Sequence, residues 1–344
     1  MKKQIITIFL LTGFWFANAQ EPMTKVILIT LDGLRWEEMF KGADSLLIAN
    51  EDYVENTKHL KEKFWRTTPE ERRQALMPFV WSFVNENGQI HGNRELGSKV
   101  TLSNQMHFSY PGYNEILTGN SDDINIHSND KIYNPNVTVL EKVNNKKHYK
   151  GKVAAFGSWD LFPYIINDKR SGIPVNGGFR KANGNNLTDR EVFLNELQDQ
   201  IPGPWDNVRL DAFTHHFALE NFKKNHPLLT YISYGETDDF AHDGKYDYYL
   251  TSANRSDAFI KQLWEFTQKD PFYKDQTVFI ITTDHGRGHE PLDTWRSHGS
   301  DIEGSEQTWM LMFGKGIKVL GEVSQKEDLS PTLISPMIED YFSK

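Results

Sequence analysis

The fold is decided by the stretch KVILITLDG, residues 25–33, a continuous apolar run that ends abruptly at Asp32 and Gly33. A run this rich in Ile, with no polar alternation, predicts a strand that is buried on both faces of a parallel sheet. Open α/β sheets carry their chemistry at the carboxyl ends of such strands. Asp32 is therefore either a metal ligand at that end or an ordinary N-cap of the next helix.

Apolar runs of the same kind alternate with amphipathic, helix-like segments along the rest of the chain. This alternation predicts an α/β fold with a mainly parallel central sheet and helices on both faces. No repeat, linker or composition break divides the sequence, so we expect one domain over residues 20–344, with cap or flap segments at 44–100 and 160–190. The expected strands are 152–159, 228–233, 277–286 and 308–316, and the expected helices are 137–143, 189–198, 210–224, 248–268 and a capped helix within 325–338.

A second notable stretch is SYPGYNEILTG, residues 109–119, where a serine precedes a Pro-Gly bend and an apolar run. Ser, Pro and Gly before helix-forming residues mark a loop that opens a helix. A hydroxyl at that point faces the positive end of the helix dipole, which suits a nucleophile or the binding of an anion. An ordinary N-cap serine is the alternative.

Composition restricts the chemistry that this chain can perform. The net charge of −9 and the isoelectric point of 5.8 argue against a nucleic-acid-binding surface, which is usually basic. An acidic chain can still act on phosphate, because bound metal ions reverse the sign of the local field. The sequence has no cysteine, so disulfides are excluded and any metal must be held by oxygen and imidazole nitrogen.

The N-terminus has the pattern of an export signal. A basic start at Lys2 and Lys3 is followed by an apolar run over 5–16 and an Ala-Asn-Ala cleavage site at 17–19. The run is shorter than the roughly 20 residues that a membrane-spanning helix needs. We therefore expect removal of residues 1–19, a mature chain without a membrane anchor, and a location in the bacterial periplasm or the medium.

Acidic and histidine side chains follow several of the predicted strands. The ends of neighbouring parallel strands lie close in space, so these groups are expected to converge. Three carboxylates and three imidazoles at one place require cations, and two divalent ions are the natural solution. An oxygen and nitrogen ligand set favours Zn²⁺ and leaves Mn²⁺ possible. The residues are Asp32, Asp238, His242, Asp284, His285 and His298.

Four motifs, in this order and spacing, resemble the alkaline phosphatase superfamily, and most closely its branch of type I phosphodiesterases and nucleotide pyrophosphatases. The motifs are LDG, SYPGYNEILTG, ETDDFAH and TTDHGRGH, and the likeness extends to DLSPT near the C-terminus. The resemblance implies that one zinc is held by Asp32, Ser109, Asp284 and His285. It implies that Asp238, His242 and His298 hold a second zinc, and that Ser109 is the nucleophile.

Two further residues are implied as contacts of the substrate phosphate. Asn129, together with backbone N–H groups at the start of the Ser109 helix, would bind phosphate oxygens. Arg170, in DKRSG, resembles an arginine of secreted monoesterases and would add a charge-assisted contact.

The motifs also depart from the pattern of that branch. Gly112 and Tyr113 replace Asn and His, and Thr237 replaces Pro between Glu236 and Asp238. The sulfatase pattern, in which Cys or Ser is followed by x-Pro-x-Arg, is absent after Ser109, which argues against a formylglycine sulfatase.

Together these features predict an exported, zinc-dependent hydrolase of small-molecule phosphoric esters that acts through a phosphoseryl intermediate. Because a monoester carries more charge than a diester, the Arg170 contact favours monoesters. A phosphodiesterase or nucleotide pyrophosphatase is the first alternative. A phosphomutase shares the ligand order, although export argues against it, and a non-catalytic metal-binding relative is a third alternative, although no ligand position is lost.

Overall fold

Strand β1 (Lys25–Leu31) lies fully buried in the middle of an eight-stranded sheet, as its apolar sequence predicts. The protein is described from a computed structural model covering residues 23–343, so the predicted signal segment 1–19 lies outside the described residues. The strand order is β10-β2-β9-β7-β1-β6-β4-β5, and β1 pairs in parallel with both β6 and β7. The other strands of this sheet are β2 (Gly88–His91), β4 (Val153–Gly157), β5 (Val175–Gly177), β6 (Leu229–Tyr234), β7 (Thr277–Thr282), β9 (Met310–Gly314) and β10 (Gly321–Glu322).

The prediction of a mainly parallel sheet is confirmed, with β9 as the exception. The predicted strand 308–316 forms β9, which runs antiparallel to both β7 and β2. A smaller sheet, in the order β11-β3-β8, lies beside it. Its strands are β3 (Ser98–Thr101), β8 (Gln307–Thr308) and β11 (Glu327–Leu329).

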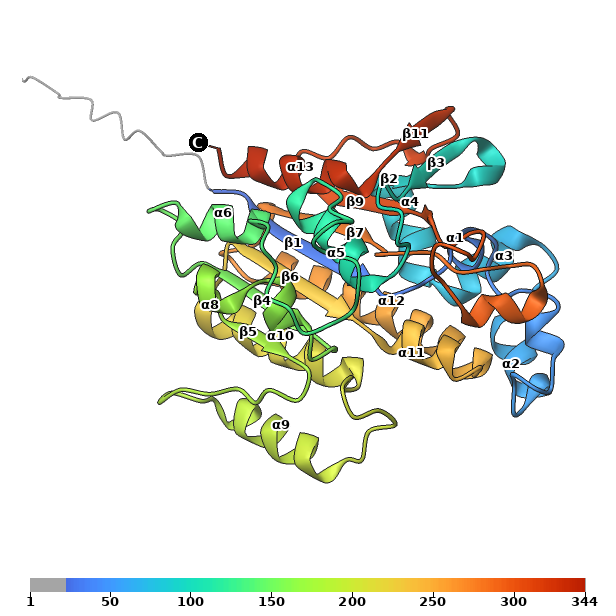
Figure 1. Cartoon of the computed structure of the whole chain (residues 1–344), viewed down its shortest axis with the longest axis horizontal. Coiled ribbons are helices and arrows are strands. Elements are labelled where there is room, and N and C mark those ends of the chain that lie inside the picture. The colour runs from blue at the N-terminus through green and yellow to red at the C-terminus, as the bar shows by residue number, and fades with distance from the viewer. Residues whose placement is uncertain (1–22, 344) are drawn as a thin grey trace, which may run out of the picture.

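Helices cover both faces of the main sheet, and alternate residues of β1 face the two layers. Ile27 and Ile29 belong to one core with residues of α10 and α12, whereas Val26 and Leu28 belong to the other with residues of α5, α6 and α13. Figure 1 shows α5, α6 and α13 together on one side of the sheet. The helices are α1 (Trp36–Lys41), α2 (Thr57–Phe64), α3 (Pro69–Leu76), α4 (Asn85–Asn87), α5 (Ser109–Thr118), α6 (Val139–Asn145), α7 (Phe162–Ile165), α8 (Asp168–Ser171), α9 (Asp189–Gln200), α10 (Asp211–Asn225), α11 (Glu236–His242), α12 (Tyr246–Lys269) and α13 (Ile334–Tyr341).

Three segments differ from their sequence-based expectation. The stretch 44–100 contributes β2 to the main sheet and β3 to the small one, and 160–190 contributes the edge strand β5. In the C-terminal stretch, residues Glu327–Leu329 pair with β3 as a strand before the helix begins at Ile334. These short strands have no apolar run of their own, and partners distant in the sequence stabilise them.

Glycine at position 112 lets helix α5 approach the loop that follows β7. A Cβ atom built on Gly112 would lie 2.1 Å from the backbone oxygen of Asp284. That distance is far inside van der Waals contact, and the atom it meets belongs to the main chain. The first turn of α5, which carries Ser109, can therefore lie against the Asp284 loop only because residue 112 has no side chain.

Replacing Gly112 by Ala should therefore displace α5 and lower the free energy of unfolding by about 2 kcal/mol, the usual effect of overpacking. Urea denaturation followed by circular dichroism measures this change. Gly203→Ala is the matched control, because its Cβ would meet its nearest neighbour at an ordinary 3.5 Å. Equal unfolding free energies for the two variants would contradict the proposed close approach.

Candidate metal and nucleophile site

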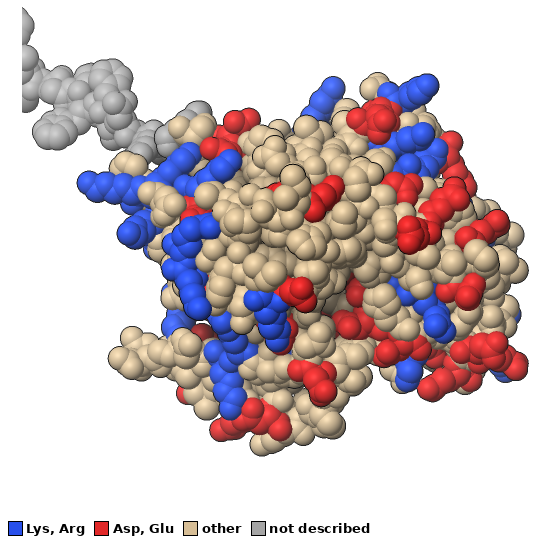
Figure 2. Space-filling view, in the orientation of Figure 1, with Lys and Arg blue, Asp and Glu red and all other residues tan. Residues whose placement is uncertain are grey.

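The seven predicted metal ligands meet near the carboxyl ends of β7, β1 and β6, which are adjacent in the sheet. Most of them line a cavity of about 130 Å³. Figure 2 shows the surface hollowed near the middle of the face it draws, between acidic side chains. The cavity is lined by Asp32, Ser109, Asn129, Trp159, Asn207, Val208, Gly235, Asp238, Asp239, His242 and His298.

The first group of ligand atoms comes from the ends of β1 and β7 and the start of α5. The Nε2 atom of His285 lies 3.3 Å from Asp32 Oδ1 and 3.6 Å from Asp284 Oδ2. The Ser109 hydroxyl lies 3.3 Å from the same nitrogen. All four side chains are buried, and the ligand atoms of Asp32, Asp284 and His285 are close enough to share one ion.

Hydrogen bonding leaves the metal-facing atoms of this group free. The Nδ1 atom of His285 lies 2.9 Å from the backbone oxygen of Gly286, so it carries the proton and donates, and Nε2 keeps its lone pair. Asp32 Oδ1 and Asp284 Oδ2 are buried without a hydrogen-bond partner among the described residues. Buried carboxylate oxygens are rarely left unpaired, and this pattern fits a bound divalent cation.

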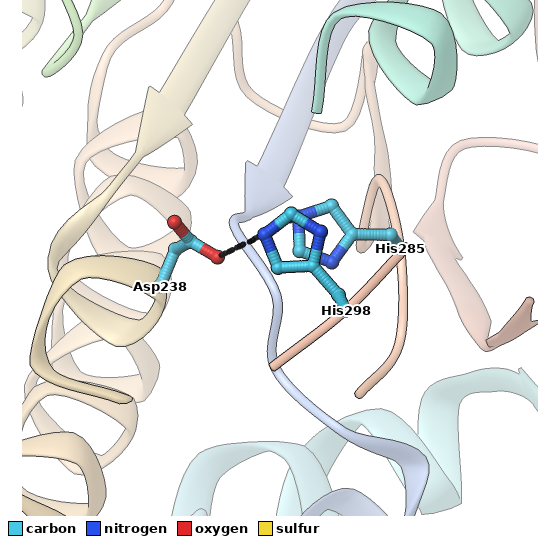
Figure 3. Close-up of side chains that lie close together, drawn as sticks. All are labelled: Asp238, His285 and His298. Carbon is cyan, nitrogen blue, oxygen red and sulfur yellow. Dashed lines mark ion pairs between the residues drawn. The ribbon is translucent and has the colours of Figure 1, made fainter. Parts of the chain in front are cut away.

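The second group adjoins the first. His242 Nε2 lies 3.0 Å from His298 Nε2 and 3.3 Å from Asp238 Oδ2. Figure 3 shows the rings of His285 and His298 side by side, with the Asp238 carboxylate facing them. Asp238 Oδ1 is 3.7 Å from His298 Nε2 and 3.5 Å from His285 Nε2. The two predicted sets of ligands therefore form one continuous cluster.

The electrostatics of the cluster show an excess of negative charge. Burial and then the neighbouring Asp238 raise the pKa of Asp32 well above its usual range, and burial and then Asp32 do the same for Asp284. Burial also acts to raise the pKa of Asp238, but Arg287 and His242 outweigh it and lower that pKa. Asp32 and Asp284 thus have less compensating charge within the chain than Asp238, and bound cations would supply it.

Arg287, which the sequence did not single out, is the cation that the chain itself supplies. It is fully buried, forms an ion pair with Asp238 and donates to the backbone oxygens of Gly33 and Arg296 at 3.2 and 2.8 Å. It stands within TTDHGRGH, three residues after Asp284, so its place in that motif was the available signal. Through these contacts Arg287, which lies in the loop after β7, connects the segment that follows β1 with the first turn of α11.

Two buried carboxylates, also not predicted, position the helix that carries Asp238 and His242. Asp211 accepts from the N–H groups of Gly235 and Glu236 at 2.7 and 3.1 Å, at the start of α11. Glu236 in turn accepts from the N–H of Asp211 at 2.9 Å, at the start of α10. Each helix start is thus capped by an acid from the other.

Tyr113 and Thr237, which differ from the residues usual in the motifs of the phosphodiesterase branch, both form hydrogen bonds with Asp32. The Tyr113 hydroxyl donates to Asp32 Oδ2 at 2.7 Å and accepts from Ser233 at 3.1 Å, so Asp32 Oδ1 is the oxygen left for a metal. The Thr237 hydroxyl donates to the backbone oxygen of Asp32 and joins α11 to the end of β1.

Asn129 lies at the cavity, where its predicted role requires it. Its Oδ1 accepts from the backbone N–H of Tyr110 at 3.0 Å, which leaves its Nδ2 without a partner among residues 23–343 and available to a ligand. Residues 110 and 111, at the start of the Ser109 helix, have no free backbone N–H group that could bind phosphate oxygens as the sequence predicted. The Tyr110 N–H is engaged by Asn129, and Pro111 has no N–H to offer.

Arg170 lies outside the cavity, so its expected contact with phosphate is corrected. Its guanidinium forms an ion pair with Glu141 at 2.8 Å and donates to the backbone oxygens of residues 134–136. The carboxylate of Glu141 is almost completely buried, so the pair fixes Arg170 at the edge of α6. Sequence likeness could not show this competing partner.

Comparisons with known proteins support the fold. No sequence family and no curated protein sequence matches this chain. Its structure is similar to that of the alkaline phosphatase PafA, with 11% identity over 94% of this chain and 96% of that one and a TM-score of 0.60. Murine ectonucleotide pyrophosphatase/phosphodiesterase 5 has 13% identity over 93% of this chain and 95% of that one, with a TM-score of 0.55. The 2-O glycosaminoglycan sulfatase BT1596 has 12% identity over 93% of this chain and 71% of that one, with a TM-score of 0.52.

Metal binding should raise the melting temperature, and the gain should grow from about pH 5.5 to about pH 8. The raised pKa values mean that the metal-free folded chain retains protons on Asp32 and Asp284, which a metal must displace and which are lost as the pH rises. Differential scanning calorimetry of chelator-treated and zinc-supplemented protein measures the gain.

His285→Ala should remove most of that gain, because His285 belongs to both groups of ligands. His148→Ala, which changes an exposed histidine, is the matched control. A melting temperature that does not respond to zinc at either pH would contradict the metal site.

Proposed function

We propose that this chain, which has the alkaline phosphatase superfamily fold, is a metal-dependent hydrolase of phosphoric esters with Ser109 as its nucleophile. The observation that carries the proposal is the position of the Ser109 hydroxyl. It begins helix α5, is buried, and lies 3.3 Å from the unprotonated Nε2 of His285 within a cluster of unpaired carboxylate oxygens.

Asp32, Ser109, Asp284 and His285 would hold one divalent ion, and Asp238, His242 and His298 would hold a second. Oxygen and nitrogen ligands suit Zn²⁺, with Mn²⁺ as the alternative. Such ions lower the pKa of a bound hydroxyl and stabilise the charge that develops on phosphoryl oxygens.

The chain's own residues define the rest of the reaction. The oxygen of Ser109 forms a bond to phosphorus as the ester's alcohol leaves, and water then cleaves that bond, which restores the serine and releases the phosphate product. The free Nδ2 of Asn129 is placed to donate to a phosphoryl oxygen. Tyr113 and Arg287 hold Asp32 and Asp238 in orientation throughout.

A diester suits this cavity better than a monoester. The preference for monoesters rested on Arg170, whose guanidinium is bound to Glu141 instead. The residues lining the cavity include no Lys or Arg, so within the described chain the second charge of a monoester meets no cationic side chain. We therefore favour phosphodiesters as substrates.

The other activities have weaker support. The sulfatase nucleophile pattern is absent after Ser109, and a non-catalytic role leaves the convergence of all seven predicted metal ligands without a reason. A phosphomutase would not need the export signal that we propose for residues 1–19. No helix within residues 23–343 has the length and apolarity needed to cross a bilayer.

Ser109→Ala should lower kcat/KM by at least about 1,000-fold, because Ser109 carries the only hydroxyl among the described residues that line the cavity. Hydrolysis of bis(p-nitrophenyl) phosphate by zinc-supplemented enzyme measures this loss. Ser121→Ala, at an exposed serine just beyond α5, is the matched control and should behave as the wild type. Substantial turnover by Ser109→Ala would exclude the covalent mechanism.

Arg170→Ala should change the ratio of kcat/KM values for p-nitrophenyl phosphate and its diester by no more than about twofold. The variant should lose thermal stability, since Arg170 ties Glu141 to residues 134–136. Arg180→Ala, which breaks the pairing of another exposed arginine with Asp168, provides the comparison. A selective loss of monoester hydrolysis in Arg170→Ala would place Arg170 at the substrate.

A further inference from the structure

We propose that a second cavity, the β5 cavity at the edge of the main sheet, binds a neutral, hydroxyl-rich ligand of the oligosaccharide class. The β5 cavity has a volume of about 770 Å³. Small-molecule sites in proteins usually occupy about 300–1,000 Å³, so a short oligosaccharide fits its size. Binding at this place would not require the proposed hydrolase activity.

The β5 cavity lies between the edge of the sheet and helices α9 and α10. Strand β4 contributes Phe156, strand β5 contributes Asn176, and helix α10 contributes Phe217 and Asn221. Figure 1 shows α9 beyond β5, at the lower edge of the view. No residue lines both this cavity and the one at the metal-ligand cluster. The segment 172–174, which also lines it, precedes β5, so a ligand here would lie away from the carboxyl ends of the strands.

The charged side chains that line the β5 cavity are already paired. The pairs are Arg180–Asp168 at 2.6 Å, Lys181–Asp199 at 2.5 Å and Lys224–Glu191 at 2.9 Å. Among the described residues, the lining therefore offers no unpaired cation or anion to a ligand. An ionic ligand would have to break one of these pairs or lose its hydration without gaining a partner, and either change costs free energy. The lining thus favours a ligand without net charge.

Unpaired carboxamide groups supply the polar part of the lining. Asn221 makes no side-chain hydrogen bond with any described residue, and its Oδ1 is buried. The Oδ1 of Asn176 is also buried without a partner, although its Nδ2 donates to the backbone oxygen of Arg180 at 2.8 Å. Buried polar groups are rarely left unpaired in proteins, and a ligand would complete these hydrogen bonds. Because a carboxamide both donates and accepts, as a hydroxyl group does, these side chains suit a ligand that carries many hydroxyl groups.

Apolar side chains form the rest of the lining. Phe156, Val175 and Phe217 belong to the buried core and also line the β5 cavity. A sugar ring presents apolar C–H groups on its faces and hydroxyl groups around its rim, so it can meet both kinds of side chain at once. A phosphate ester would find no unpaired cation here, and a hydrocarbon chain would leave the carboxamides unpaired. A neutral saccharide is therefore the class of ligand that this lining fits.

Isothermal titration calorimetry of the full chain with neutral trisaccharides tests the inference. The probes are maltotriose, cellotriose, mannotriose and triacetylchitotriose, which differ in linkage and in substituents. We expect at least one of them to bind saturably in the millimolar range or below. Asn221→Leu, which removes an unpaired carboxamide at similar volume, should weaken that binding about tenfold. Asn183→Ala, at an exposed residue that lines the cavity, should weaken it several-fold.

Asn145→Leu, at an exposed asparagine of α6, is the matched control and should bind the trisaccharide as the wild type does. Absence of binding by all four trisaccharides would overturn the inference. An affinity that is unchanged in both Asn221→Leu and Asn183→Ala would overturn it as well, because the sugar would then bind elsewhere. If Asn221→Leu does not fold, Asn183→Ala provides the same comparison.

Two further measurements separate the β5 cavity from the proposed hydrolase site. Inorganic phosphate should change the affinity for the trisaccharide by no more than about twofold, because no cation in the β5 cavity is free to bind it. Displacement of the sugar by phosphate would contradict the assignment of a neutral ligand. Asn221→Leu should keep kcat/KM for bis(p-nitrophenyl) phosphate within about twofold of the wild type. Sugar binding by a protein without esterase activity would support the β5 cavity and refute the hydrolase.

Discussion

The structure depends on three carboxylates held together at the ends of adjacent strands. Parallel pairing of β1 with β6 and β7 brings Asp32, Asp238 and Asp284 to one edge of the sheet. Like charges this close repel, so the surrounding chain is arranged to compensate for them. Arg287 pairs with Asp238, Tyr113 donates to Asp32, and the Gly33 amide donates to Asp284 at 3.1 Å. The compensation is incomplete, and the bound cations that we propose would balance the remaining charge.

The same edge explains why the sequence predicted so much of this site. The strands β1, β6 and β7 are long, apolar and buried on both faces, so their existence could be predicted, although β7 ends at Thr282 and not at the predicted residue 286. The acidic and histidine side chains that follow such strands lie close together, as predicted. Asp211 and Glu236 could not be found in this way, because their mutual capping depends on how two helix starts meet in space. For Arg170 the prediction was wrong: sequence likeness suggested a phosphate contact but could not reveal the ion pair with Glu141.

A glycine and a threonine hydroxyl allow helices α5 and α11 to lie close to the ends of strands β7 and β1. Gly112 permits α5 to lie against the backbone of Asp284, and Thr237 ties α11 to the end of β1. With Arg170 held elsewhere and no Lys or Arg lining the cavity, the substrate's charge must be met by cations at the carboxylate cluster.

We propose that the cluster of carboxylates and imidazoles binds two metal ions. Inductively coupled plasma mass spectrometry, on protein purified without chelators and dialysed against zinc and then buffer, measures its metal content. We expect about two divalent ions per chain, as in two-metal sites generally. A chain that retains well under one ion would contradict it, because Asp32 and Asp284 would then be buried without the cations that their arrangement requires.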